Sequence, residues 1–166
     1  YEEKKQEQYL GFVYNNIGSV LLSQGNNEKA IEYLNKAVSV AEKIKDVSGL
    51  ITAKTNIASI LFNKRDYLNS EKIFLELIDL IEKTKIKQTL ATIYMNLGVC
   101  YHEQRKFDEA LKSFLKAESL FSEKGDGKGM AMVLVNIANC YTDMKNFEKA
   151  NEYLERAKLF CEKIKS

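Results

Sequence analysis

Residues 90–121 read LATIYMNLGVCYHEQRKFDEALKSFLKAESLF, and their apolar residues recur at the spacing of two amphipathic helices. A polar run, Glu103-Gln104-Arg105-Lys106, separates the two apolar series and marks a tight turn. The segment therefore predicts a helical hairpin. Its apolar faces comprise Leu90, Ile93, Leu97, Cys100 and Tyr101 in the first helix, and Phe107, Ala110, Leu111, Phe114, Ala117, Leu120 and Phe121 in the second.

The same pattern occurs four times along the chain with a period of 40 residues, as the positions Asn16, Asn56, Asn96 and Asn136 show. A fixed period of this length indicates an array of identical supersecondary units rather than one globular core. We therefore predict an all-α solenoid of four helical hairpins. Each repeat also places a small residue ahead of a bulky one, in the pairs Ala30 and Leu34, Ser70 and Phe74, Ala110 and Phe114, and Ala150 and Leu154.

Turn signals divide the chain into a single array, residues 1–166, with repeats at about 10–48, 49–87, 88–127 and 128–166. Asn26, Asp66 and Asn146 stand where the second helix of a hairpin needs an N-cap. We expect eight helices, at about 2–28, 29–45, 49–64, 67–84, 88–104, 107–124, 128–144 and 147–164, with the first ending near residue 24. On the first helices, Gly18, Ala58, Gly98 and Ala138 are predicted where a second backbone comes close.

Composition excludes several classes of function. The chain has 166 residues and no proline, and its 25 basic and 23 acidic residues give a net charge of +2. These charges are finely mixed, so we expect neither nucleic acid nor a membrane as a direct partner. No apolar run approaches the ~20 residues that span a bilayer. Three cysteines are too few for a disulfide scaffold and favour a reducing, cytoplasmic compartment. Because the chain starts at Tyr1 without a Met, we expect a fragment of a longer protein.

The repeats resemble the tetratricopeptide repeat, whose pattern is an aromatic residue, Leu-Gly, Tyr, Ala, Phe and Ala. The resemblance covers about residues 10–164. The second repeat departs most, with Lys54, Ser70 and Leu77 in place of an aromatic residue and two alanines. The third repeat matches best, through Tyr94, Leu97, Gly98, Tyr101, Ala110, Phe114 and Ala117.

The period exceeds the family's usual ~34 residues, and repeats of this length resemble those of bacterial peptide-pheromone receptors and of sensor regions in transcriptional regulators and histidine kinases. The resemblance implies a right-handed superhelix whose concave groove is lined by the first helix of each pair. It also implies a non-catalytic module that binds a protein or peptide segment within an intracellular signalling or transcriptional regulator. The alternative is a structural scaffold or self-association spacer with an empty groove, with self-association through the C-terminal end.

The predicted groove surface is neutral and rich in amides, which can both donate to and accept from a peptide bond. It contains no Lys or Arg, so a clamp for a partner's C-terminal carboxylates, known in the family, is not expected. The asparagines have a second interpretation, in which they bond to a neighbouring helix. The ligand-binding residues predicted are Asn16, Ser19, Asn56, Ser59, Phe62, Asn63, Asn96, Val99, His102, Glu103, Asn136, Asn139 and Asp143, and further groove-facing positions are Asn15, Ser23, Thr52, Thr55, Thr92, Met95, Met132, Val135 and Thr142.

Four weaker motifs favour ordinary structural roles. His102 has no second His nearby and Cys100 is predicted on the other side of its helix, so no metal site is expected. Glu103 and Asp143 are equivalent carboxylates without a predicted partner, which indicates a solvated rim. The stretch 125–129 lacks the ending of a phosphate loop and is interpreted as a flexible linker. Lys83, Lys85 and Lys87 lack an aromatic platform for nucleic acid. We expect no catalytic residue, no metal and no cofactor.

Overall fold

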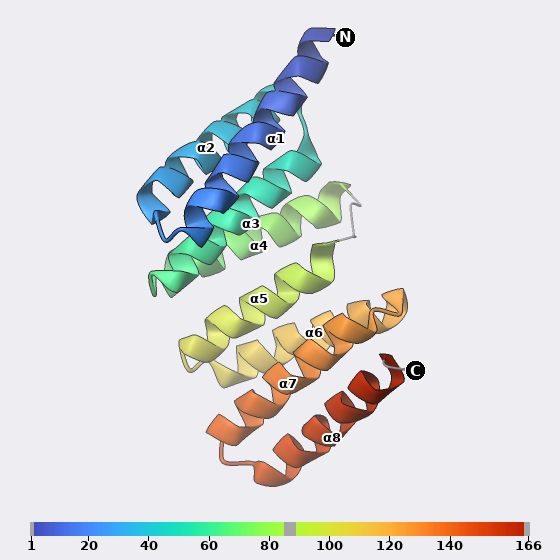
Figure 1. Ribbon diagram of the computed structural model, residues 1–166. Helices are drawn as coiled ribbons and strands as arrows, with labels where there is room; N and C mark the ends of the chain where they lie inside the picture. The colour runs from blue at the N-terminus through green and yellow to red at the C-terminus, as the bar shows by residue number, and fades with distance from the viewer. Residues whose placement is uncertain (1, 85–88, 165–166) are drawn as a thin grey trace. The chain divides into compact units, whose positions relative to one another are not determined.

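The computed structural model describes residues 2–84 and 89–164, and within these ranges the chain forms eight α-helices and no strand (Figure 1). They pair as four hairpins, which confirms the predicted all-α helical-repeat fold. The helices are α1 (Glu2–Ser23), α2 (Asn27–Ile44), α3 (Val47–Asn63), α4 (Tyr67–Thr84), α5 (Leu90–Glu103), α6 (Phe107–Lys124), α7 (Gly127–Asp143) and α8 (Phe147–Ile164).

In three of the four hairpins, one turn residue both closes the first helix and caps the second. The Asn26 N–H donates to the Leu21 carbonyl at 2.9 Å and closes α1. The Asn26 side chain then accepts a hydrogen bond from the Lys29 N–H at 3.4 Å and caps α2. Asp66 and Asn146 cap α4 and α8 in the same way, at 3.3 and 3.2 Å. The three predicted N-caps are thus confirmed, and they explain why α1 ends at Ser23 rather than residue 28.

Helices of a hairpin approach each other closely where a glycine faces a bulky side chain. A Cβ atom at Gly98 would lie 2.5 Å from Cε1 of Phe114, and one at Gly18 would lie 2.7 Å from Cγ of Leu34. Only a residue without a side chain fits at that distance. The predicted pairing of small and large residues is confirmed at these two positions.

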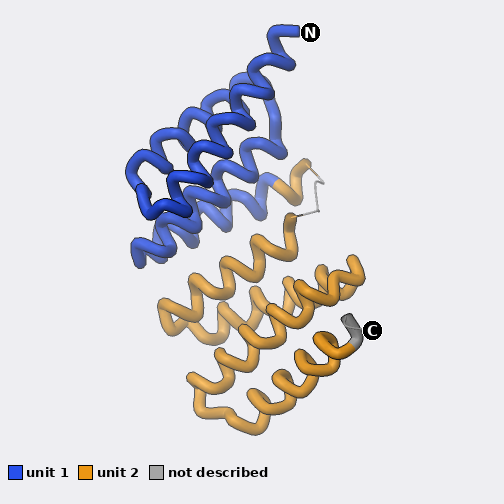
Figure 2. The backbone as a smooth tube through the Cα atoms, in the orientation of Figure 1, with its two compact units in different colours: residues 1–80 blue, residues 81–166 orange. Residues whose placement is uncertain are grey.

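Two compact units make up the chain, Tyr1–Leu80 and Ile81–Ser166, shown in different colours in Figure 2. Unit 1 contains α1, α2, α3 and most of α4, and Ala30, Leu34 and Ile60 form a core cluster in it. Unit 2 contains the last turn of α4 and all of α5 to α8. Its core is larger and joins residues of α5, α6, α7 and α8, including Phe114, Phe121 and Val133.

Ser70 is the polar residue that the second repeat places at a small packing position, and its side chain is completely buried. Its hydroxyl donates a hydrogen bond to the Ala58 carbonyl at 2.9 Å, which joins α4 to α3. The buried hydroxyl is therefore paired, and its burial does not carry the cost of an unsatisfied polar group.

Candidate functional site

The thirteen predicted ligand-binding residues lie on the first helices of the four hairpins, and none of them is fully buried. Five are exposed, namely Asn16, Asn63, Glu103, Asn139 and Asp143. Eight are partly buried, namely Ser19, Asn56, Ser59, Phe62, Asn96, Val99, His102 and Asn136. Met95 was predicted on the same surface, but it is only 7% exposed and belongs to the core of unit 2. That prediction is wrong because Met95 packs with Met130 and Val133 of α7 in one apolar cluster.

In unit 1 the asparagine of the second repeat is tied to a neighbouring helix. Asn56 Nδ2 on α3 donates to Asn15 Oδ1 at 3.1 Å and lies 3.2 Å from Ser19 Oγ, both on α1. The Ser19 hydroxyl itself donates to the Asn15 carbonyl at 3.0 Å. Asn56 therefore has the packing role that the second interpretation assigned to the asparagines.

The equivalent asparagine in unit 2 has different neighbours. Asn136 on α7 corresponds to Asn56, and the residues that correspond to Asn15 and Ser19 are Met95 and Val99. Neither replacement can accept a strong hydrogen bond. Within residues 2–84 and 89–164, the side chains of Asn136 and Asn96 make no hydrogen bond, although both are partly shielded from water. Two amides are thus left with free donors and acceptors on α5 and α7.

His102 joins these amides on the same pair of helices. Its Nε2 lies 3.0 Å from Asp143 Oδ2 on α7, and its Nδ1 lies 3.9 Å from Glu103 Oε1. The contact with Asp143 lacks the alignment of a hydrogen bond, and Nε2 is buried without such a bond to any described residue. The ring packs 5.7 Å from that of Phe107. Glu103 and Asp143 are both exposed, as expected of a solvated rim, and each lies near the His102 ring.

We call the surface formed by Asn96, His102, Asn136, Asn139 and Asp143 the α5–α7 face. It lies within unit 2 and combines amides, an imidazole and a carboxylate without any Lys or Arg. Such groups offer hydrogen bonds of both polarities and little net charge. No group of three or more His, Cys, Asp and Glu residues suited to a metal ion occurs in the described chain.

Sequence reasoning did not find a pocket of about 280 Å³ in unit 1, between α1, α2 and α3. Its apolar floor comes from α2 and its rim from polar residues and one phenylalanine. The signal was present in two glycines, Gly11 and Gly49, at helix positions that usually disfavour glycine. The lining residues are Gln8, Gly11, Phe12, Asn15, Ala37, Val40, Ala41, Ile44, Asp46, Ser48, Gly49 and Thr52.

The structure describes the glycine-rich stretch in full and the basic stretch only in part. The glycine-rich stretch is a tight turn, not a flexible linker, because Gly125 ends α6 at a φ of 66° and Asp126 caps α7 with a hydrogen bond from Gly129 N–H at 2.8 Å. Lys85 and Lys87 of the basic stretch lie outside the described residues.

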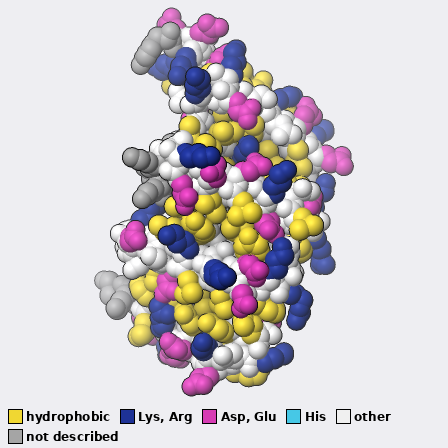
Figure 3. Space-filling model, turned by 180° about the vertical axis from the view of Figure 1, so that it is seen from behind, with side chains coloured by type: hydrophobic (Ala, Val, Ile, Leu, Met, Phe, Trp, Pro, Cys, Tyr) yellow, Lys and Arg dark blue, Asp and Glu magenta, His cyan; other side chains and the backbone are white. Residues whose placement is uncertain are grey.

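On the face seen in Figure 3, Lys and Arg are interspersed with Asp and Glu. Among the described helices, none is long and apolar enough to cross a bilayer.

Comparison with protein families supports the repeat assignment along almost the whole chain. Models described as tetratricopeptide repeat match residues 13–44, 49–123 and 89–163. The chain belongs to the tetratricopeptide repeat family. Repeats of this family generally form non-catalytic interaction modules, and the fold of this chain supports a protein–protein interaction function.

Solved structures share the fold of this tetratricopeptide repeat chain at low sequence identity. BtubC from P. vanneervenii matches with a TM-score of 0.86 and 21% identity over 96% of this chain. The apo form of RapI matches with a TM-score of 0.87 and 17% identity over 95%. A signal transduction ATPase with a tetratricopeptide repeat sensor from Pyrococcus horikoshii matches with a TM-score of 0.83 and 21% identity over 93%.

The chain spans 66%, 57% and 24% of the lengths of those three proteins, respectively. The search of curated protein sequences found no match.

Proposed function

We propose that this tetratricopeptide repeat chain binds a peptide segment, and that the α5–α7 face contacts the peptide backbone. The observation that carries the proposal is the pair of partly buried amides at Asn96 and Asn136, whose side chains make no hydrogen bond among the described residues. The polar atoms of these two amides remain accessible, since neither residue contributes a buried unpaired atom. A ligand that supplies peptide N–H and C=O groups can therefore reach them and form hydrogen bonds in a partly shielded setting.

The chemistry of the face favours a peptide over other ligands. Its amides match the donors and acceptors of an extended or helical backbone, and the absence of Lys and Arg gives no affinity for phosphate groups. We further propose that the chain is a module of an intracellular signalling or transcriptional regulator. The Pyrococcus horikoshii protein supports this role, since its repeats are described as a sensor.

Peptide binding by Asn96 and Asn136 can be tested by substitution, with Asn56 as the control. We expect Asn96→Ala and Asn136→Ala each to weaken binding about tenfold, and to leave the melting temperature nearly unchanged. Asn56→Ala should instead lower the melting temperature, because it removes the hydrogen bond to Asn15. The ligand would be a peptide selected from a random library on the wild-type chain, with affinity measured by fluorescence anisotropy. Recovery of no binding peptide, or full affinity in both unit 2 variants, would refute the proposal.

A second candidate function is self-association, and the exposed ends of the two units favour it. Val20 on α1 is 55% exposed, whereas the equivalent Ile60 and Cys140 are completely buried. Leu154 on α8 is 44% exposed, whereas the equivalent Leu34 is completely buried in a cluster with Ile60. Ile60 and Leu34 pack against each other inside unit 1. Val20 is equivalent to Ile60 and Leu154 is equivalent to Leu34, so the two exposed residues could form the same contact between two copies of the chain. We propose that α1 of one copy packs on α8 of another.

A head-to-tail contact of this kind joins two different surfaces, so variants of each surface should complement one another. We expect Val20→Glu and Leu154→Glu to be monomeric separately and to form a one-to-one dimer when mixed, because the mixture retains one intact pair of surfaces. Sedimentation velocity over a range of concentrations would measure this. A wild-type chain that stays monomeric at high concentration would refute self-association and leave these surfaces to further repeats of a longer chain.

A further inference from the structure

The pocket of unit 1 is a largely apolar feature that neither the α5–α7 face nor the exposed ends explain. Its floor is formed by four side chains of α2, Ala37, Val40, Ala41 and Ile44. Its walls come from α1 and α3, which with α2 form the upper part of the ribbon in Figure 1. All three helices belong to unit 1.

The two units differ in what fills this position. Phe121 of α6 corresponds to Ala41 of α2, and Gly129 of α7 corresponds to Gly49 of α3. A Cβ atom at Gly129 would lie 2.3 Å from Cδ1 of Phe121, so in unit 2 a phenyl ring lies directly against the glycine. In unit 1 a Cβ atom at Gly49 would lie 2.6 Å from Oδ2 of Asp46, the N-cap of α3, and 3.7 Å from Cβ of Ala41. Unit 1 therefore has the equivalent glycine without a ring against it, and the Asp46 carboxylate lies beside that glycine.

The rim carries groups that suit a peptide ligand. Phe12 is 64% exposed at the edge of the pocket. Asn15 lines the pocket, and its Oδ1 accepts a hydrogen bond from Asn56 at 3.1 Å, which fixes the orientation of its amide. An exposed aromatic ring beside a positioned amide provides one stacking partner and one hydrogen-bonding group.

We propose that this pocket binds an aromatic side chain of a peptide ligand, in the position that the Phe121 ring occupies in unit 2. The volume of about 280 Å³ is too small for a drug-sized ligand. It does exceed the ~150 Å³ of a cavity that accommodates benzene. The pocket is therefore of a size for a single large side chain. This inference rests on the proposed peptide-binding function and assigns that function's side-chain specificity.

The test uses capped amino acids as probes, so it does not depend on knowing the natural ligand. N-acetyl-phenylalanine methylamide should shift the backbone amide NMR signals of Gly11, Gly49 and Thr52 in the full chain. The corresponding alanine and leucine probes should bind at least about fivefold more weakly, because they bury less apolar and aromatic area. Equal binding of all three probes, or shifts located outside the pocket, would overturn the proposal.

Two variants and a control complete the experiment. Ala41→Phe reproduces the Phe121 and Gly129 pair of unit 2 and should abolish probe binding in a chain that circular dichroism shows to be folded. Phe12→Thr introduces the residue found at the equivalent positions Thr52 and Thr92, and should weaken binding several-fold without changing the core. Ser39→Phe adds the same ring at an exposed position of α2 and should leave binding unchanged.

Retained binding in folded Ala41→Phe would refute the proposal. Unchanged binding in Phe12→Thr would refute it if Ala41→Phe does not fold. Failure of the α5–α7 face is distinguishable, because Asn96→Ala affects selected peptides and not the capped phenylalanine probe.

Discussion

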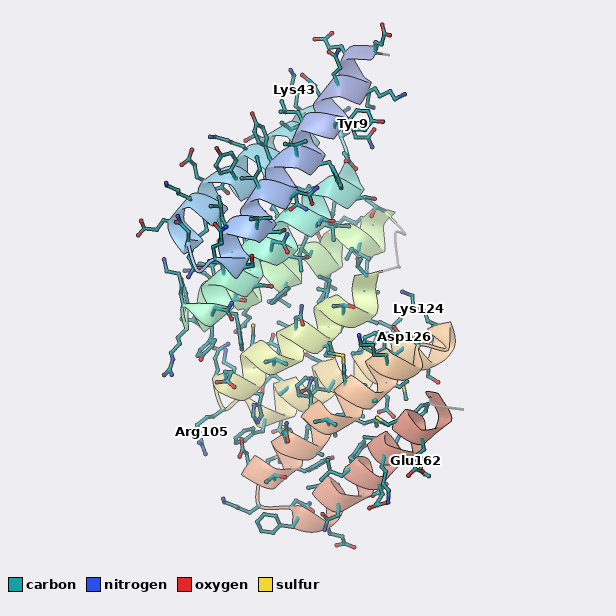
Figure 4. All side chains as sticks on the ribbon, in the orientation of Figure 1. Tyr9, Lys43, Arg105, Lys124, Asp126 and Glu162 are labelled. Atoms are coloured by element: carbon teal, nitrogen blue, oxygen red, sulfur yellow. The ribbon has the colours of Figure 1, made fainter. Side chains whose placement is uncertain are left out.

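At the scale of single residues, the four hairpin turns share one left-handed backbone position. The first repeat places Gly25 there, at a φ of 76°. The others place Arg65, Arg105 and Lys145, at φ values of 63°, 60° and 63°, and Arg105 is labelled at the α5–α6 turn in Figure 4. A residue with a Cβ atom is strained in this conformation by about 1–2 kcal/mol. All four turns share this backbone geometry, but three of them have Arg or Lys where glycine would be least strained.

We predict that Arg65→Gly and Lys145→Gly each raise the free energy of unfolding by about 0.5–1 kcal/mol, because the relief of strain exceeds the entropy that glycine gains on unfolding. Urea titration would measure the change. Lys112→Gly, in the interior of α6, should cost about 1 kcal/mol and serves as the control. A loss of stability in both turn variants would contradict the strain argument.

Reactivity toward thiol reagents should separate the cysteines by burial. Cys140 is completely buried, and its Sγ lies 3.7 Å from the Phe107 carbonyl oxygen. Burial, with a smaller effect of the carboxylates Asp143 and Asp108, raises the pKa of the Cys140 thiol from 9.0 to about 11. Cys161 is exposed. We predict that iodoacetamide at neutral to mildly alkaline pH modifies Cys161 in the folded chain and leaves Cys140 intact.

The same shift predicts how stability depends on pH. The folded chain holds the Cys140 proton more tightly than the unfolded chain, so the contribution is fully present below the unfolded pKa near 9 and is lost as pH rises to about 11. Urea titrations from pH 8 to 11 should show a decline that is smaller in Cys140→Ala. An identical decline in that variant would assign the effect to other groups.

At the scale of the helices, one N-cap is missing from an otherwise regular set. The second helices α2, α4 and α8 are capped by Asn26, Asp66 and Asn146. Lys106 occupies the equivalent position before α6, and its side chain makes no capping hydrogen bond. We predict that Lys106→Asn raises the free energy of unfolding by about 1 kcal/mol.

Lys106→Ala is the control for that prediction. It removes the contact of Lys106 with the Tyr101 ring, 5.5 Å from the ring centroid, without adding a cap. Stabilisation by asparagine but not by alanine, in thermal unfolding followed by circular dichroism, would identify the cap as the cause. Equal effects of the two substitutions would show that loss of the lysine is what matters.

At the scale of the whole molecule, the boundary between the two compact units falls inside α4, after Leu80. Ser70 and Leu77 depart from the family pattern in the second repeat, but Ser70 is hydrogen-bonded and Leu77 is completely buried. Packing of these two residues is therefore no source of weakness, and what sets α4 apart is that its residues are divided between the two compact units. Repeat arrays open locally where the coupling between neighbouring parts is lowest.

We predict that backbone amides of α4 exchange with solvent faster than those of α6, which has the same length of 18 residues and lies wholly within unit 2. Hydrogen exchange followed by mass spectrometry on the full chain would compare the two helices directly. Equal or slower exchange in α4 would show that the boundary has no effect on local stability.

The sequence by itself determined the period, the eight helices, the three hairpin N-caps and the close contacts at Gly18 and Gly98. These features depend on residues within one repeat, so a pattern along the chain contains all the information that specifies them. The helix ends agreed with expectation to within a few residues, because capping residues define them locally.

Only the tertiary structure decided which of the predicted site residues have side chains available to bind a ligand. Asn56 and Asn136 occupy the same place in their repeats, yet Asn56 bonds to α1, whereas Met95 and Val99 stand where the partners of Asn136 would be expected. Ala41 and Phe121 likewise occupy equivalent positions, but Ala41 lines a pocket whereas the Phe121 ring lies against Gly129. A side chain's partners come from the neighbouring repeat, so equivalent residues share an environment only where those neighbours also match.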